Sequence, residues 1–281
     1  MIRNIRALIQ SELVAVGTVW LILEIYYGLI NTETTARVGF WVFLIISLVL
    51  GVMWFLADGF LFAGYLKRSI EIQSNAFDTT VKVLFADVFF QDGVKVISVN
   101  EFFDSVVDGN HVSGISLHGN MLKNFWGGNV NDWDKQVTEE LKNIKPIEVL
   151  SNRLAPGKPN KYAIGTTIKA TINNNNFLCV ALTHTNINTL QSSANSDDLN
   201  KALRELLAKA RITCSGHALN IPLIGSGLAR TGIKANIIVN LILLAIVEES
   251  KKQKITGEIR IILPKNMSNK IDLTTIWKDW G

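Results

Sequence analysis

The sequence predicts an N-terminal transmembrane α-helical hairpin followed by an α/β domain in which helices sandwich a mixed sheet. Of the 281 residues, 48% are hydrophobic, and the mean hydropathy of +0.24 is high for a chain without membrane segments. From about residue 80 onward, strand-like and helix-like patterns alternate. These observations predict two membrane helices within residues 1–66, a linker over 67–79 and one domain over 80–281.

Two apolar stretches near the N-terminus predict the hairpin. Residues 38–57 form a run of 20 residues without a charged side chain, and about 20 apolar residues are enough to cross a bilayer as a helix. Residues 13–30 form a run of 18 residues that contains one acid, Glu24. A short polar segment joins the two runs, and the second helix could extend as far as residue 66.

Two other interpretations of the first run are open. It could be a cleaved signal peptide, because Arg3 and Arg6 resemble a positively charged start, but no small-residue cleavage site follows. The pair could also be a buried core hairpin, although the unbroken length of residues 38–57 argues against that. We therefore expect two membrane spans.

Basic residues predict the orientation of these spans. Arg3 and Arg6 precede the first span, and Lys67 and Arg68 follow the second. Because Lys and Arg favour the cytoplasmic side, both termini are expected in the cytoplasm, as in a multi-pass protein of the bacterial inner membrane.

Acids in and beside the spans are the unusual feature of the hairpin. Glu24 would lie about 10 Å from the end of its span, whereas Asp58 follows the other span at its cytoplasmic end. Glu24 could be neutral, or it could face a hydrated path in an assembled oligomer.

The order of patterns in the domain predicts its sheet. A strand–helix alternation in the C-terminal half predicts parallel pairing, and the middle of the chain adds antiparallel partners. Ser196 is the expected N-cap of the longest helix. The expected strands are 81–89, 94–100, 161–172, 176–185, 218–225 and 257–264, and the expected helices are 132–144, 196–217, 234–253 and 272–280.

Charge and metal-ligating residues narrow the possible functions. The net charge is +4, and no basic run exceeds Lys251–Lys252, so the sequence predicts no nucleic-acid partner. Cys179 and Cys214 lie in apolar patterns and are expected to be reduced core residues. No metal site is predicted, because the spacing of the histidines does not match that of metal ligands. These histidines are His111, His118, His184 and His217.

A small-residue turn is the strongest sign of a binding site. Gly225, Ser226 and Gly227 lie at the end of an expected strand, at the edge of the sheet where ligands bind in such folds. Successive backbone N–H groups in a glycine-rich turn can form an anion nest, and a following helix would add positive potential. The turn fits neither the P-loop nor the Rossmann pattern, so a phosphate cradle and a plain tight turn are both open.

Several short motifs resemble macro domains. They are "FADVF" at 85–89, "VISVN" at 96–100 and "IPLIGSGLARTG" at 221–232. The resemblance implies binding of an ADP-ribose derivative. Two spans followed by such a domain with "SVNEFFDS" and "SLHG" are similar to the membrane-anchored macro-domain effectors of type II Thoeris anti-phage defence. In that family, a TIR-domain partner makes a histidine–ADP-ribose conjugate from NAD, and the macro domain senses it.

The resemblance also implies individual ligand contacts. Asp87 and Val88 are expected at the adenine, and Asn100 at the distal ribose. The loop of Ser116, Leu117, His118 and Gly119 is expected on the phosphate side, although the family's triple glycine is absent from it. The diphosphate loop and its flanks comprise Pro222, Gly225, Ser226, Gly227, Leu228, Ala229 and Arg230.

Structural roles are open for four of the polar residues. Asp87 could cap a turn and Asn100 a helix, His118 could be an ordinary surface residue, and His184 could be a core residue with satisfied bonds.

Ala229 indicates binding without turnover. One branch of hydrolytic macro domains carries an acid at this position, and Ala229 offers no general base. The expected function is therefore a sensor without cofactor or catalytic residues, in which ligand binding drives homo-oligomerisation and disrupts the bilayer. A membrane-tethered ADP-ribosyl hydrolase and a passive membrane anchor are the alternatives.

Overall fold

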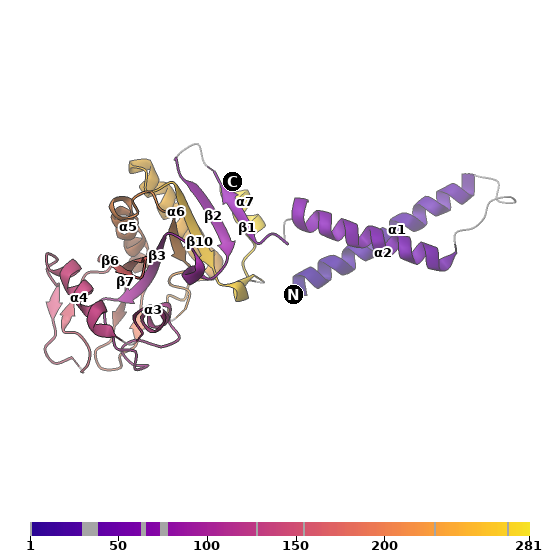
Figure 1. Ribbon diagram of the computed structural model, residues 1–281. Coiled ribbons are helices and arrows are strands. Elements are labelled where there is room, and N and C mark those ends of the chain that lie inside the picture. The colour runs from indigo at the N-terminus through magenta and orange to yellow at the C-terminus, as the bar shows by residue number, and fades with distance from the viewer. Residues whose placement is uncertain are drawn as a thin grey trace. The chain divides into compact units, whose positions relative to one another are not determined.

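The computed structural model describes residues 2–29, 39–62, 66–73, 78–127, 129–153, 155–227, 229–268 and 270–281. It consists of two compact units, a helical unit of residues 1–68 to which 272–275 are also assigned, and an α/β domain of residues 69–271 and 276–281 (Figure 1).

Two helices that pack against each other form the first unit. They are α1 (Ile2–Leu29) and α2 (Phe40–Ala57), and a π-helical turn over Asp58–Phe62 continues α2. Segments Ile5–Tyr27 and Phe40–Leu61 have mean hydropathies of 1.7 and 2.5 and are long and apolar enough to cross a membrane. Helix α1 begins well before residue 13, because charged side chains do not end a helix. Residues 30–38 and 63–65, which include ends of the predicted spans, lie outside the described residues.

The contact between α1 and α2 contains small and polar residues. Ser11 and Ser47 are buried. A Cβ atom at Gly51 would overlap the carboxylate of Glu12, so only glycine fits there without a shift of the Glu12 side chain. Small residues at such positions allow two helices to approach closely.

A mixed sheet forms the centre of the domain, as the sequence predicts. Its strand order is β1-β2-β10-β9-β3-β7-β6, and β8 pairs with the end of β7. Strands β2, β10, β9, β3 and β7 are parallel, while β1 and β6 are antiparallel to their neighbours at the two edges. The strands are β1 (Ser69–Ile72), β2 (Thr80–Phe85), β3 (Val94–Asn100), β6 (Thr167–Ile172), β7 (Asn175–Thr185), β8 (Ser192–Ser193), β9 (Leu219–Pro222) and β10 (Glu258–Leu263), with β4 (Glu148–Val149) and β5 (Asn160–Lys161) forming a separate pair.

Helices cover both faces of this sheet. Alternate residues of β7 point to opposite faces, and both sets are buried, with Phe177 and Cys179 on one side and Leu178 and Val180 on the other. The face of Phe177 packs with α3 and α4 in one apolar cluster, and α5 packs against β7 and α6. The helices are α3 (Leu117–Trp126), α4 (Val130–Leu141), α5 (Ser196–Thr213), α6 (Ala235–Lys252) and α7 (Leu273–Trp280).

The structure differs from the sequence prediction at several boundaries. Residues 69–72 form the edge strand β1, although the sequence predicts a linker there. The sequence predicts a loop over 116–119, but this segment is the start of helix α3. Asn195 rather than Ser196 caps α5, because its side chain accepts from the Asp197 and Asp198 amides. Strand β2 ends at Phe85, and a 3-10 turn over Val88–Phe90 follows it.

Candidate functional site

The carboxyl ends of β2, β9 and β3 bring three predicted segments to one edge of the sheet. These parallel strands are followed by Asp87, by the Gly225 turn and, at the end of β3, by Asn100. Three strand spacings of about 4.8 Å, roughly 14 Å in total, separate β2 from β3. The Gly225 turn follows β9, which lies between them, so the three segments form one row along the sheet edge.

Asp87 has a structural bond at one end of this row. Its Oδ1 accepts a hydrogen bond from the Phe89 amide at 2.9 Å and caps the 3-10 turn. The residue is exposed, whereas the neighbouring Val88 is buried. The role as a turn cap is therefore observed, and a ligand contact by Asp87 is compatible with its exposure.

The Gly225 turn owes its shape to local hydrogen bonds. Gly225 has φ +85°, a conformation that L side chains rarely adopt. Its carbonyl accepts from Oγ1 of Thr231 at 2.7 Å, and Oγ of Ser226 donates to the carbonyl of Leu223 at 2.7 Å. Gly227 is exposed, and a Cβ atom there would meet nothing within 4 Å. Hydrogen bonds thus hold the turn at Gly225 and Ser226, whereas Gly227 is exposed to solvent.

The backbone amides of this turn are the candidate donors for an anion, although Gly225 itself is buried. Within the described residues, the amides of Gly225, Ser226 and Gly227 donate no hydrogen bond. The expected contribution of a helix start is weaker than the sequence suggested, because α6 begins only at Ala235. Pro222 ends β9 and is buried. Leu228 lies outside the described residues.

The last part of the loop is tied to a neighbouring segment. The Ala194 amide donates to the carbonyl of Ala229 at 2.9 Å, and Nη1 of Arg230 donates to the carbonyl of Ser192 at 3.2 Å. Arg230 has φ +47°. The side chain of Arg230, which the sequence assigned to the ligand, therefore has a structural partner.

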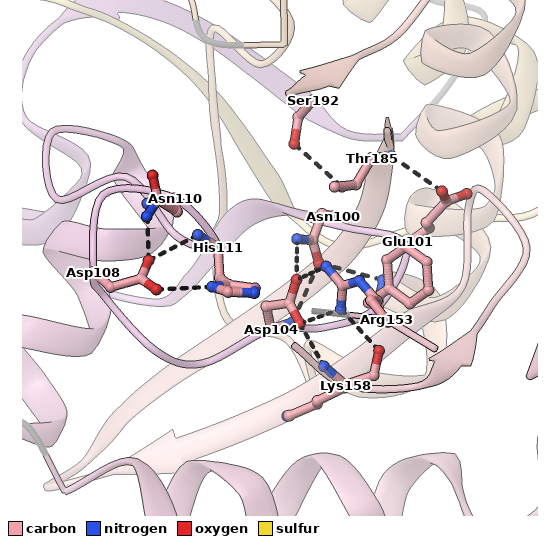
Figure 2. Close-up of polar contacts among 11 residues, drawn as sticks. Asn100, Glu101, Asp104, Asp108, Asn110, His111, Arg153, Lys158, Thr185 and Ser192 are labelled. Carbon is pink, nitrogen blue, oxygen red and sulfur yellow. Dashed lines mark hydrogen bonds and ion pairs between the residues drawn. The ribbon is translucent and has the colours of Figure 1, made fainter. Parts of the chain in front are cut away.

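Asn100 belongs to a buried polar network at the end of β3 (Figure 2). Its Nδ2 donates to Oδ2 of Asp104 at 2.7 Å, and its Oδ1 accepts from the amides of Phe102 and Asp104. Arg153 donates to both carboxylate oxygens of Asp104, at 2.7 and 2.5 Å, and its guanidinium lies 3.8 Å from the centre of the Phe102 ring. Asn100 thus caps the turn over residues 100–104.

Charge pairing satisfies the buried carboxylate of Asp104. Burial raises its pKa, but hydrogen bonds from Arg153, from the Lys158 amide and from Asn100 together lower it more, so that the pKa lies below the ordinary value. Burial lowers the pKa of Lys158 more than Asp134 and Asp104 raise it. The network is a buried ion pair with satisfied oxygens, which is the condition under which such pairs are tolerated.

The second predicted loop is the N-terminus of α3. Oγ of Ser116 accepts from the Gly119 amide at 2.9 Å and caps the helix. A Cβ at Gly119 would overlap the carbonyl of Ser113, so this position requires glycine. Leu117 is half-buried.

His118 is not the surface residue that the sequence allowed. Its ring lies 5.6 Å from that of Trp133, and burial lowers its pKa to about 3, which keeps the imidazole neutral. The side chain is buried against Trp133 of α4, so it is not presented to a ligand at this loop.

His111 and His184 pair with carboxylates, whereas His217 is exposed. Nδ1 of His111 lies 2.8 Å from Oδ2 of Asp108 (Figure 2), and half-exposed His184 lies between Glu101 and Asp198. In the part of the chain that is described, no group of three or more His, Cys, Asp or Glu side chains is placed to hold a metal ion. Cys179 and Cys214 are buried free thiols, and burial raises the pKa of both.

Sequence reasoning missed the partners of the predicted residues. Arg153 lies 49 positions after Asp104, and no local pattern links the two. Glu101 and Asp104 lie inside the motif "SVNEFFDS", so an acid directly after the end of a strand was the available signal.

Comparisons with known proteins identify the family and support the fold of this chain. The family described as the macro domain of Thoeris protein ThsA matches residues 81–264. Thoeris protein ThsA of Bacillus amyloliquefaciens (strain Y2) is 22% identical over 208 residues, which cover 72% of this chain and 68% of that protein. A solved Oceanobacillus iheyensis macrodomain, a mutant described with ADPR, has a TM-score of 0.50 at 13% identity, covering 75% of this chain and 95% of that one. The chain therefore belongs to the ThsA macro-domain family of Thoeris anti-phage defence effectors.

Proposed function

We propose that this protein is a Thoeris effector whose macro domain binds an ADP-ribose derivative, with the diphosphate on the Gly225–Gly227 turn. The observation that carries the proposal is the set of three unused amides at the carboxyl edge of the sheet, within the described residues. Backbone N–H groups in such a turn favour an anionic guest because their partial positive charges converge on it.

The row of segments along the sheet edge supports an extended ligand. Asp87 is exposed at the end of β2, where its carboxylate can accept from an adenine amine, and Val88 offers the adjoining amide. Asn100 ends β3 at the other end of the row, where we propose the distal ribose, although its own side chain is buried and bonded to Asp104. The roughly 14 Å between these strands suits a dinucleotide-sized guest with its diphosphate in the middle.

Family membership supports the identity of the signal. The solved neighbour is described with ADPR, and Thoeris effectors are linked to a TIR-domain partner that produces the signal. We propose histidine–ADP-ribose as the ligand of this chain. At 13% identity the structural likeness concerns the fold, so the ligand itself has to be tested.

The two apolar helices supply the proposed output. We propose that they span the bacterial inner membrane with both termini in the cytoplasm, and that ligand binding favours an assembled form of the domains. A ligand shifts this equilibrium only if it binds the assembled form more tightly. Assembly of the domains would bring several helical hairpins together in the bilayer, and the clustered hairpins would make the membrane permeable.

Binding without turnover is the proposed mode of action. Ala229 offers no general base, and the amide of Asn100 already bonds Asp104. The hydrolase alternative predicts release of ADP-ribose from an ADP-ribosylated protein by the purified chain. Detection of that reaction at a useful rate would replace the sensor model.

Calorimetry of the full chain in lipid nanodiscs tests the ligand. ADP-ribose, cyclic ADP-ribose and histidine–ADP-ribose are compared, and saturable binding of histidine–ADP-ribose is expected to be the tightest. Dye leakage from vesicles carrying the protein, with and without this ligand, tests the output. Binding without leakage would favour the passive anchor instead.

A further inference from the structure

His184 joins two structural elements of the candidate site. Its Nδ1 lies 2.8 Å from Oε2 of Glu101, and its Nε2 lies 3.1 Å from Oδ1 of Asp198. Glu101 is buried and directly follows Asn100 at the end of β3. Asp198 lies in the first turn of α5. One imidazole therefore links the end of β3 to the start of α5.

Asp198 also fixes the start of α5. Its Oδ2 accepts from the Asn195 amide at 2.9 Å, while Oδ1 of Asn195 accepts from the Asp198 amide at 2.9 Å, which completes a capping box. Reciprocal bonds of this kind set where a helix begins. A shift of Asp198 would therefore move Asn195 and the residues next to it.

The same segment supports the Gly225 turn. A Cβ atom at Gly225 would lie 3.6 Å from both methyl carbons of Leu199, the residue after Asp198. The amide of Ala194, the residue before Asn195, donates to the carbonyl of Ala229. The loop over residues 225–229 thus contacts the start of α5 at two points, through Leu199 and through Ala194.

A second link joins this segment to β7. The hydroxyls of Thr185 and Ser192 lie 3.3 Å apart, and the amide of Thr185 donates to Oε1 of Glu101 at 3.1 Å (Figure 2). Ser192 also accepts from Arg230 through its carbonyl. Glu101, His184 and the 192–199 segment therefore form one continuous path from Asn100 to the diphosphate turn.

The protonation state of His184 decides whether both of its bonds exist. Two carboxylates need two N–H donors, and only the imidazolium has a donor on each nitrogen. Burial lowers the pKa of His184, but the hydrogen bonds and charges of Glu101 and Asp198 raise it above the ordinary value. The other charges nearby are Lys161, whose Nζ lies 3.7 Å from Oε1 of Glu101, and Glu148, 3.6 Å from Lys161.

We propose that His184 is a positioning residue that, as an imidazolium, holds the α5 start and the Gly225 turn in register with Asn100 for ligand binding. This rests on the proposed ADP-ribose-type site. Because the pKa of His184 is raised in the folded chain, its stabilisation of the site geometry is complete at low pH. This stabilisation is lost as the pH rises through the raised pKa. Deprotonation leaves one donor for two carboxylates and releases one of them.

The test compares the wild-type chain with the His184→Gln variant, both at full length and in lipid nanodiscs. The glutamine amide never carries a positive charge. ADP-ribose is the probe, at about pH 6 and about pH 8.5. The wild-type affinity is expected to fall about fivefold between these values. The affinity of His184→Gln for ADP-ribose is expected to be the same at both pH values and to equal the weaker wild-type affinity at the higher pH. His217→Gln, which changes an exposed histidine beyond the other end of α5, is expected to follow the wild type.

Hydrogen exchange without ligand separates this inference from the proposed function. The protection factor of the Ala194 amide, which reports its bond to Ala229, should fall in His184→Gln and in the wild type at the higher pH. Unchanged protection and a wild-type affinity in His184→Gln at about pH 6 would overturn the positioning role. A fall in protection in His184→Gln, with no binding of either ADP-ribose or histidine–ADP-ribose by the wild type, would support positioning and reject the proposed ligand site.

Discussion

Gln136 on α4 bonds the backbone of Thr171 on β6 in both directions. Its Oε1 accepts from the Thr171 amide at 2.8 Å, and its Nε2 donates to the Thr171 carbonyl at 3.1 Å. Oε2 of Glu140, one helical turn later, accepts from the Lys169 amide at 3.1 Å. The two side chains occupy groups on the outer edge of β6 that another strand could use, so they protect this edge of the sheet from pairing.

Replacing Gln136 by leucine should expose the β6 edge. We expect a loss of about 1 kcal/mol in unfolding free energy for the lost hydrogen bonds and concentration-dependent self-association of the variant. Light scattering of the detergent-solubilised chain measures the association. Lys135→Leu adds the same apolar side chain at an exposed position of α4 whose own partner is Asp132, and equal association of both variants would contradict the edge-protection role.

Removing Arg153 should destabilise the domain strongly. Asp104 and Arg153 have side chains that are each 1% exposed, and Arg153→Met leaves the carboxylate buried without its main partner. The expected cost is about 3–5 kcal/mol. Thermal unfolding followed by tryptophan fluorescence measures it. Arg204→Met, which breaks the exposed pair with Glu248, should cost less than about 1 kcal/mol, and similar losses in the two variants would refute this estimate.

These contacts illustrate what the sequence could predict. The mixed sheet and the place of the Gly225 turn follow from local patterns, because apolar periodicity and a glycine pair after a strand are local signals. The partners of Asn100 could not be predicted, because Asp104 meets Arg153 only after the chain has folded. Helix α3 was missed because Gly119 and Asn120 weaken its local propensity, while tertiary packing of Met121 and Leu122 stabilises it.

Asp108 should make stability dependent on acid pH. Burial raises its pKa, but bonds from the His111 imidazole and from the amides of His111 and Asn110 outweigh burial and lower the pKa to about 2. Because the pKa is lowered in the folded chain, ionised Asp108 contributes fully to the unfolding free energy above its ordinary pKa of about 3.9. This contribution is lost as the pH falls toward the lower pKa of the folded chain. The difference in thermal midpoint between the wild type and Asp108→Asn should therefore be largest near about pH 6 and shrink toward about pH 3. A difference that stays constant would exclude this linkage.

A negative charge at Gly227 should abolish ligand binding without unfolding the domain. A Cβ atom there meets nothing within 4 Å, so Gly227→Glu fits sterically but repels a diphosphate. We expect at least a tenfold loss of ADP-ribose affinity, about 1.4 kcal/mol, with an unchanged thermal midpoint. Gly227→Gln has nearly the same shape without the charge and should retain most of the affinity. Equal losses for both variants would mean that bulk, not charge, decides binding at this turn.

A larger side chain at Gly51 should disturb the helical hairpin. A Cβ atom there would overlap the carboxylate of Glu12 on α1, and the larger leucine side chain would have to displace that side chain from the contact between the helices. Gly51→Leu is therefore expected to separate α1 from α2 and to abolish ligand-induced dye leakage from vesicles, while calorimetry still finds ligand binding by the domain. Gly17→Leu is the matched control, since a Cβ atom at Gly17 meets nothing within 4 Å. If Gly51→Leu leaks like the wild type, close packing of α1 and α2 is not needed for the proposed membrane disruption.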